Sequence, residues 1–401
     1  MQRFPRPKGR LGVSAFMLLA ATACGQSVDE TVSDAANTSA DAAEAEIETM
    51  SPTAPGDASE QLQQAFSVTL PPFPDLPAPK ADLSDAATGL VYFNTRSPYD
   101  FSVVLNDYEK ATPTVGMGTL VLPDGASAEN PVPAMIILHG SGGIKEGREF
   151  KYAELFAENG VASFVVDYYA PRGATENTPY QLKTMATTDI DVLADAYAAL
   201  KFVGTHPAID AERIGVTGYS YGGMATRYAL DARMKDIMAP ETPPFALHID
   251  VYGPCFQKLG ATKTTGAPYL AIYGDEDNSV DPDACQIVQN EIKAGGSSVE
   301  AHLMPGAGHA WENDQARAET PLPYVRDCWF DYAPETGALL INGVDAGSPP
   351  LDATRDERAQ FRASLAELAG PCVGVGYIVG SDPETDQKAK ALMLDFMRDN
   401  F

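Results

Sequence analysis

The sequence predicts an α/β fold, with a mainly parallel sheet that has helices on both of its faces. Short apolar runs, such as residues 134–138, alternate along the chain with segments whose apolar residues recur at helical spacing. Glycine and proline mark most of the boundaries between these segments. Strands that alternate with helices of this length form βαβ units, and such units build a parallel sheet.

The individual elements follow from the same pattern, starting near residue 87. Apolar runs predict strands at residues 116–122, 134–138, 161–168, 213–217, 245–252, 269–273 and 299–304. Helical spacing predicts helices at residues 149–159, 180–202, 221–231, 285–294 and 386–401. Residues 312–382 are rich in proline and glycine, and we expect an irregular extension or lid there, with one helix near residues 356–368.

The N-terminus has the pattern of a targeting segment. Basic residues precede an apolar run at residues 11–21 that is too short to span a bilayer comfortably. The run ends in A-T-A-C, which resembles a bacterial lipoprotein signal, so residues 1–24 are predicted as signal and lipobox with Cys24 lipidated. The protein is then expected to be exported and anchored by lipid, facing the periplasm or the cell surface. The alternative is an ordinary secreted, soluble protein.

Two further segments follow from composition. Residues 25–65 are acidic and nearly free of large apolar side chains, so they cannot bury enough surface to fold and are predicted to form a disordered tether. Residues 66–401 are predicted to form one folded domain. The formal net charge of −27 repels nucleic acid, which excludes that class of partner.

The cysteines agree with export. Beyond Cys24 the chain has four, and an even number in an oxidising compartment suggests two disulfides. We predict Cys255–Cys285, because both follow neighbouring strands and should meet at one sheet edge. The remaining pair is then Cys328–Cys372, flanking the irregular extension. No C-x-x-C motif is present, and no metal ion or other cofactor is predicted.

The strongest chemical signal is G-Y-S-Y-G-G at residues 218–223. It stands where a predicted strand ends and a predicted helix begins, and a serine on that sharp turn projects its hydroxyl above the sheet. Ser220 is therefore the candidate nucleophile. The alternative is a glycine-rich turn with an incidental serine.

A serine hydroxyl needs a base, and the base needs an orienting carboxylate. His309 is the candidate base, because a glycine-rich loop directly after the last strand lets its imidazole fold back over the sheet edge. In hydrolases whose serine stands on such a strand-to-helix turn, the acid lies between the serine and the histidine in the sequence. Asp275, Glu276, Asp277 and Asp281 compete in one loop, and Asp277 is preferred because it is clear of the preceding strand.

The oxyanion formed by attack on a carbonyl needs preorganised N–H donors. The backbone N–H of Tyr221 is one candidate, and Ser141, or else Gly142, in H-G-S-G-G (residues 139–143) is the other. Tyr219, Trp311 and Arg172 are weaker candidates for substrate contact. For Arg172, gripping a substrate carboxylate competes with a structural salt bridge.

Five motifs together resemble the dienelactone hydrolase family of α/β-hydrolases: H-G-S-G-G, D-Y-Y-A-P-R-G (residues 167–173), G-Y-S-Y-G-G, G-D-E-D and P-G-A-G-H-A-W. The resemblance covers roughly residues 90–400. It implies the α/β-hydrolase fold, a sheet of about eight strands, a Ser or Cys/His/Asp triad and no cofactor. The founding members use a cysteine nucleophile where this chain has Ser220, so a lactone substrate does not carry over.

These residues predict hydrolysis of a small carboxylic ester through an acyl-enzyme. One alternative is a peptidase or amidase of the same fold. Another is a non-catalytic surface lipoprotein that uses the fold as a binding scaffold.

Overall fold

A computed structural model describes residues 69–401, apart from the side chain of Glu146. The predicted signal segment, Cys24 and the predicted tether lie outside the described residues. Within residues 69–401, none of the helices is both long and apolar enough to cross a bilayer.

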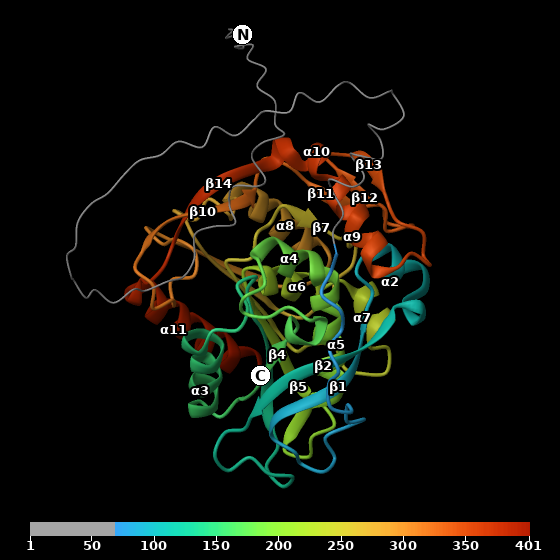
Figure 1. Cartoon of the computed structure of the whole chain (residues 1–401). Coiled ribbons are helices and arrows are strands. Elements are labelled where there is room, and N and C mark those ends of the chain that lie inside the picture. Colours follow the sequence, from blue (N-terminus) through green and yellow to red (C-terminus); the bar gives the residue numbers. More distant parts are fainter. Residues whose placement is uncertain (1–68) are drawn as a thin grey trace, which may run out of the picture. The chain divides into compact units, whose positions relative to one another are not determined.

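An eight-stranded sheet forms the centre of the domain, in the order β1-β2-β4-β3-β5-β6-β8-β9 (Figure 1). The pairs β1–β2 and β2–β4 are antiparallel, and all later pairs are parallel. This confirms the predicted mainly parallel α/β sheet. The strands are β1 (Gly89–Ser97), β2 (Thr112–Val121), β3 (Val132–Leu138), β4 (Ala162–Asp167), β5 (Ile209–Tyr219), β6 (His248–Val251), β8 (Tyr269–Gly274) and β9 (Val299–Met304).

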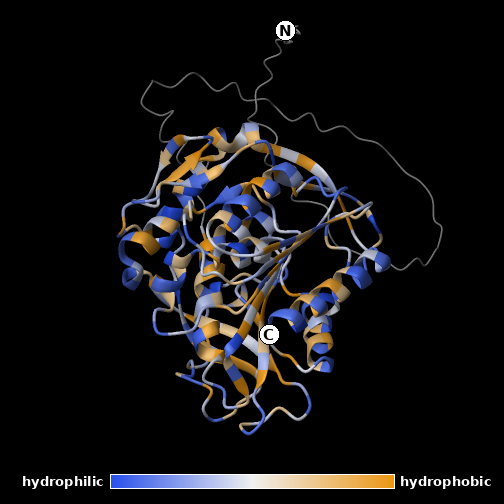
Figure 2. Cartoon of the chain, turned by 180° about the vertical axis from the view of Figure 1, so that it is seen from behind, coloured by the Kyte–Doolittle hydropathy of each residue, from blue (hydrophilic) through white to orange (hydrophobic). Residues whose placement is uncertain are grey.

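Helices cover both faces of this sheet. Alternate residues of its central strands point to opposite sides, and apolar side chains on each side pack against helices. Ile136 and Leu138 pack with α5, α6 and α7, whereas Met135 and Ile137 pack with α3, α8 and α11. In Figure 2 the central strands are mostly orange and the helices carry both colours. The helices are α2 (Phe101–Asp107), α3 (Lys151–Glu158), α4 (Tyr180–Ala186), α5 (Asp189–Val203), α6 (Tyr221–Tyr228), α7 (Ala232–Met238), α8 (Pro282–Ala294), α9 (Arg355–Ser364), α10 (Ala366–Ala369) and α11 (Pro383–Asn400).

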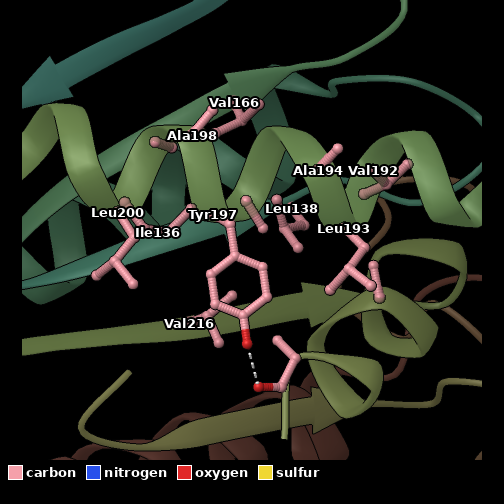
Figure 3. Close-up of a cluster of buried hydrophobic side chains, with 14 of the residues drawn as sticks. Ile136, Leu138, Val166, Val192, Leu193, Ala194, Tyr197, Ala198, Leu200 and Val216 are labelled. Carbon is pink, nitrogen blue, oxygen red and sulfur yellow. Dashed lines mark hydrogen bonds between the residues drawn. The ribbon is translucent and has the colours of Figure 1, made fainter. Parts of the chain in front are cut away.

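Helix α5 is the most deeply buried helix, and Figure 3 shows its apolar side chains against Ile136, Leu138, Val166 and Val216. The hydroxyl of Tyr197 donates a hydrogen bond to the carbonyl of Ala229 at 2.7 Å, which satisfies the polar end of a fully buried ring. This contact fastens α5 to the end of α6, the helix that begins after Ser220.

The prediction of one long helix over residues 180–202 is wrong. The chain forms α4 and α5 with a break between them, because Thr188 starts a new helix as its N-cap. Its side chain accepts a hydrogen bond from the N–H of Asp191, and Asp191 accepts one from the N–H of Thr188. This reciprocal capping box gives hydrogen-bond partners to the N–H groups of Thr188 and Asp191 at the start of α5.

Residues 312–382 are more regular than predicted. They contribute β10 (Ala318–Val325) and β14 (Val373–Val379), which pair as an antiparallel two-stranded sheet. A second small sheet has the order β13-β12-β11-β7 and consists of β13 (Val344–Gly347), β12 (Leu339–Ile341), β11 (Phe330–Tyr332) and β7 (Gln257–Lys258). We call residues 312–382 the extension.

Both predicted disulfides are confirmed. Cys255 is bonded to Cys285 with Cα atoms 5.0 Å apart, and Cys328 to Cys372 with Cα atoms 5.5 Å apart. The first bridge joins the segment after β6 to the start of α8. The second closes the extension between the end of β10 and the start of β14.

Candidate active site

The carboxyl ends of the central parallel strands meet at one edge of the sheet. Register places Leu138 of β3 beside Gly218 of β5, and Tyr219 of β5 beside Val251 of β6. Loops that leave such strands at one edge form the usual ligand site of an open α/β sheet. The candidate residues after β3, β5, β8 and β9 therefore share this edge.

Ser220 occupies a strained turn between β5 and α6. Its φ of 53° and ψ of −110° lie in a region that a residue with a side chain rarely adopts. Its N–H donates to the carbonyl of Val251 at 2.9 Å, which fixes the turn against β6. The strain is consistent with a functional position, because the surrounding structure must hold it in place.

The glycines around Ser220 are required by close backbone approach. A Cβ on Gly218 would lie 2.1 Å from the carbonyl oxygen of Gly222, and one on Gly222 would lie 2.3 Å from that of Leu138. Real Cβ atoms do not come so close to backbone oxygens. The glycines thus let α6 start directly against the ends of β5 and β3.

Asp277 and His309 are directly joined. The imidazole Nδ1 lies 2.6 Å from Asp277 Oδ2, and both side chains are buried. Asp277 Oδ1 also accepts hydrogen bonds from the N–H of Ser279 at 2.9 Å and from its hydroxyl at 2.5 Å. Ser279 was not predicted from sequence, although it stands two residues after the acid, the usual spacing for such a turn.

The competing acids have other partners. Asp275 accepts the N–H of Gly306 at 2.7 Å, Glu276 pairs with Arg317 at 2.6 Å, and Asp281 caps the start of α8. Of the four candidates in this loop, the geometry therefore connects Asp277 to the imidazole.

Tyr252 lies beside His309 and directly follows the residue that anchors Ser220. The carbonyl that receives the Ser220 N–H belongs to Val251, and the ring of the next residue, Tyr252, has its centroid 4.5 Å from that of the His309 ring. Within residues 69–401, no hydrogen bond joins the Ser220 hydroxyl to the imidazole. Catalytic hydrogen bonds are often long without substrate and shorten only in the complex.

The loop after β3 is held by hydrogen bonds to its carbonyl groups. The carbonyl of Gly140 accepts from the Nδ1–H of His139 at 2.7 Å and from the N–H of Gly143 at 3.0 Å. The carbonyl of Ser141 accepts from the Tyr169 hydroxyl at 3.1 Å. Because the C=O and N–H of a trans peptide point in opposite directions, these contacts also fix the N–H groups of Ser141 and Gly142.

This loop lies beside the serine. A Cβ on Gly140 would stand 3.5 Å from the Cβ of Ser220. Burial lowers the pKa of His139 to about 3, so its imidazole is neutral at physiological pH and acts as a hydrogen-bond donor to the loop. His139 therefore has a structural role in this loop.

The other histidines lie away from this arrangement. His248 is fully buried, with Nδ1 2.9 Å from the carbonyl of Thr226, and His302 pairs with Glu300 on the exposed edge strand β9. His206 is buried beside the turn before β5, where its Nδ1 accepts the N–H of Ala208.

A buried polar cluster beneath the site was missed by sequence reasoning. The hydroxyl of Tyr252 donates to Glu312 Oε1 at 2.5 Å, and the Arg148 guanidinium lies 3.6 Å from the same oxygen. Burial raises the pKa of the Glu312 carboxyl, against the opposing effect of Arg148. Arg148 also donates to the carbonyl of Gly143 at 3.1 Å. The cluster therefore ties the His309 loop to the loop after β3.

The three predicted substrate contacts are all buried side chains. Arg172 is 0% exposed, and its guanidinium makes two hydrogen bonds to Asp195, at 2.6 and 3.1 Å. The structure thus assigns Arg172 to an internal ion pair rather than to a substrate carboxylate. Tyr219 and Trp311 are 0% and 1% exposed and pack around Tyr252, so direct substrate contact is not supported for them.

Over residues 69–401, no three or more His, Cys, Asp or Glu side chains are arranged to hold a metal ion.

Comparison with known proteins places the chain in a family. The model of the dienelactone hydrolase family matches residues 117–335, which include Ser220, Asp277 and His309. The chain belongs to the dienelactone hydrolase family. The match ends within the extension, before β12, β13, α9, α10 and β14.

Individual relatives are distant. A protein of a Bradyrhizobium species, described as a probable 2-oxo-3-(5-oxofuran-2-ylidene)propanoate lactonase, is 24% identical over 48% of this chain and 78% of its own length. The chain spans less than half the length of the other curated relatives that it matches.

The similarity to solved structures is low. A dienelactone hydrolase-like promiscuous phosphotriesterase from metagenomic libraries has a TM-score of 0.46 and 13% identity, over 78% of this chain and 99% of that one. An esterase of Thermogutta terrifontis has a TM-score of 0.39 and 16% identity, over 49% of this chain and 80% of that one.

Proposed function

We propose that this member of the dienelactone hydrolase family is a serine hydrolase that cleaves small carboxylic esters through an acyl-enzyme. The observation that carries the proposal is the 2.6 Å contact between His309 and Asp277, at the same sheet edge as the strained turn of Ser220. Membership of the family supports hydrolase activity in general.

The proposed reaction has two steps. Ser220 Oγ attacks the ester carbonyl carbon while His309 Nε2 accepts its proton, and the alcohol leaves with that proton. A water molecule then gives a proton to His309 while its oxygen attacks the acyl carbon, and the imidazolium returns that proton to Ser220 Oγ as the acid is released. Asp277 keeps the imidazole in the tautomer that accepts a proton at Nε2.

The developing oxyanion would be held by backbone N–H groups. Tyr221 supplies one, and Ser141 or Gly142 supplies the other. The hydrogen bonds to the carbonyls of Gly140 and Ser141 support this role, because they hold the loop before substrate arrives.

Replacement of the proposed nucleophile and base tests the proposal. Ser220→Ala and His309→Ala should each reduce hydrolysis of p-nitrophenyl acetate to near background, and the double variant should be little worse than either, because the two act as a unit. His302→Ala, which changes a partly exposed histidine of β9, is the matched control and should keep wild-type activity. Retention of more than about a tenth of the activity in either single variant would refute the assignment, since that loss is only about 1.4 kcal/mol.

The same assay separates the alternatives. Faster turnover of p-nitroanilides than of matched p-nitrophenyl esters would indicate an amidase or peptidase. Absence of turnover with any ester or amide, together with no reaction of Ser220 with a fluorophosphonate, would indicate a binding scaffold.

We also propose that the protein is exported and anchored through a lipidated Cys24. The support is the sequence alone: a basic segment, a short apolar run and A-T-A-C. Wild-type protein should incorporate labelled fatty acid, and Cys24→Ala should not. Unlabelled wild-type protein in the soluble fraction would favour ordinary secretion instead.

A further inference from the structure

The last strand of the extension holds the backbone of His309. The N–H of His309 donates to the carbonyl of Ile378 at 2.7 Å, and its carbonyl accepts the N–H of Gly380 at 3.2 Å. The carbonyl of Trp311, two residues on, accepts the N–H of Asp382 at 2.8 Å. The histidine loop is therefore paired with the end of β14 as if it were a short parallel strand.

The fit between these two segments is close. A Cβ on Gly308 would lie 2.7 Å from the carbonyl oxygen of Ile378. The ring of Tyr377 stands edge-on to the His309 ring at a centroid distance of 5.4 Å, and Tyr377 is 8% exposed. The imidazole is thus bounded by Tyr252 from the sheet and by Tyr377 from the extension.

The extension also contacts the loop that carries Asp277. Asn278 Nδ2 donates to the carbonyl of Gly376 at 3.4 Å. Arg317 Nη2 donates to Glu276 Oε2 at 2.6 Å and to the carbonyl of Gly306 at 2.7 Å. Since Glu276 belongs to the acid loop and Gly306 to the histidine loop, Arg317 joins the two directly.

A covalent bond stabilises this arrangement. A two-stranded antiparallel sheet is marginal by itself in water, and β10 and β14 form one. The Cys328–Cys372 disulfide closes it, and the N–H of Arg326 donates to the carbonyl of Cys372 at 3.0 Å. The bridge restricts the unfolded chain and so favours the paired state.

We propose that β14 holds Asp277 and His309 in position, so that this part of the extension is needed for catalysis. Tyr377 and Arg317 are its positioning residues, and we call β14 with these two residues the clamp. The inference rests on the proposed function of Asp277 and His309. Strand β14 and Tyr377 lie beyond residue 335, where the match to the family ends, whereas Arg317 lies within the matched residues. The clamp acts on the positions of Asp277 and His309, on which proton transfer depends.

Kinetics of Tyr377 variants test the clamp. Tyr377→Ala should lower kcat for p-nitrophenyl acetate about 10-fold or more with KM changed less than about twofold, because misplacing a catalytic group by a fraction of an ångström is costly. Tyr377→Phe should restore kcat, since within residues 69–401 no hydrogen bond of the Tyr377 hydroxyl is present. Val375→Ala changes a 65% exposed side chain of the same strand and is the matched control.

Proton NMR gives a readout that does not depend on turnover. The Nδ1–H of His309, bonded to Asp277, should give a low-field signal in the wild type and in Val375→Ala. That signal should weaken or disappear in Tyr377→Ala while circular dichroism stays native. If the wild type hydrolyses no ester, the proposed function fails, and the NMR comparison still decides whether the clamp orders the pair.

Arg317→Ala keeps the test decisive if Tyr377→Ala does not fold. The Arg317 side chain is partly exposed, so its loss should leave the fold intact while lowering kcat several-fold. A folded Tyr377→Ala protein with wild-type kcat and an unchanged NMR signal would overturn the proposal. If only Arg317→Ala can be measured, wild-type kcat in that variant would overturn it.

Discussion

Adding a single methyl group at Gly222 should disable the site without touching any reacting side chain. Gly222 is the second residue of α6, and its missing Cβ faces the end of β3. A Cβ there would lie 2.3 Å from the carbonyl oxygen of Leu138 and 2.6 Å from that of His139. Contacts under 3.0 Å essentially never occur, so Gly222→Ala must separate the two backbones by about 0.7 Å.

That shift separates the two proposed oxyanion donors. The N–H of Tyr221 precedes Gly222, whereas Ser141 follows the displaced end of β3. A displacement approaching 1 Å costs on the order of 100-fold in rate, and overpacking of this kind costs about 1–3 kcal/mol in stability. We therefore expect kcat/KM to fall by between about 10-fold and 100-fold, with a lower melting temperature.

The assay is hydrolysis of p-nitrophenyl acetate, measured beside thermal unfolding. Gly370→Ala is the matched control, because its φ is −51° and a Cβ there would meet nothing within 4 Å. It should keep wild-type kinetics. If Gly222→Ala keeps kcat/KM within about threefold of the wild type, the close approach of α6 to β3 is not what forms the oxyanion site.

Two further predictions concern buried charges. Arg172→Ala should reduce the free energy of unfolding by about 3–5 kcal/mol, because it leaves the Asp195 carboxylate buried without its cationic partner. Arg213→Ala, which removes a partly exposed pair, should cost less than about 1 kcal/mol. A stable Arg172→Ala protein with only a raised KM would restore the substrate role. Burial raises the pKa of the Glu312 carboxyl in the folded protein. The neutral carboxyl therefore makes its full contribution to the free energy of unfolding below the unfolded pKa near 4.5, and this contribution is lost as the pH rises through the folded pKa. Urea unfolding should therefore show Glu312→Gln gaining stability relative to the wild type as the pH rises from 4 to 8. Glu154→Gln, on the exposed side of α3, is the control and should show no such gain. A difference in unfolding free energy between Glu312→Gln and the wild type that does not change with pH would contradict the burial effect.

The elements that the sequence predicts well are those with strong local patterns. Residues 134–138 and 269–273 are apolar runs bounded by proline or glycine, and both are central parallel strands. Both disulfides were predictable because adjacent strands bring Cys255 and Cys285 to one edge, which leaves a single remaining pair. The break before α5 carried a readable signal, since Thr188 and Asp191 have capping-box spacing.

What the sequence did not predict depends on contacts between distant segments. Strands β11, β12 and β13 are only three or four residues long, and β10 contains two prolines, so these strands leave little periodicity to recognise. Glu312 is an unremarkable acid in a loop until the fold brings Tyr252 and Arg148 to it. Arg172 was open to two interpretations, because only the packing of α5 shows that Asp195 lies beside it.

The most direct test of the central claim is the site and rate of reaction with a fluorophosphonate, read by mass spectrometry of tryptic peptides. We expect one adduct per chain, on Ser220, and slow or no labelling in His309→Ala, because the hydroxyl needs its base. An adduct on another residue, or labelling of Ser220→Ala at the wild-type rate, would contradict it.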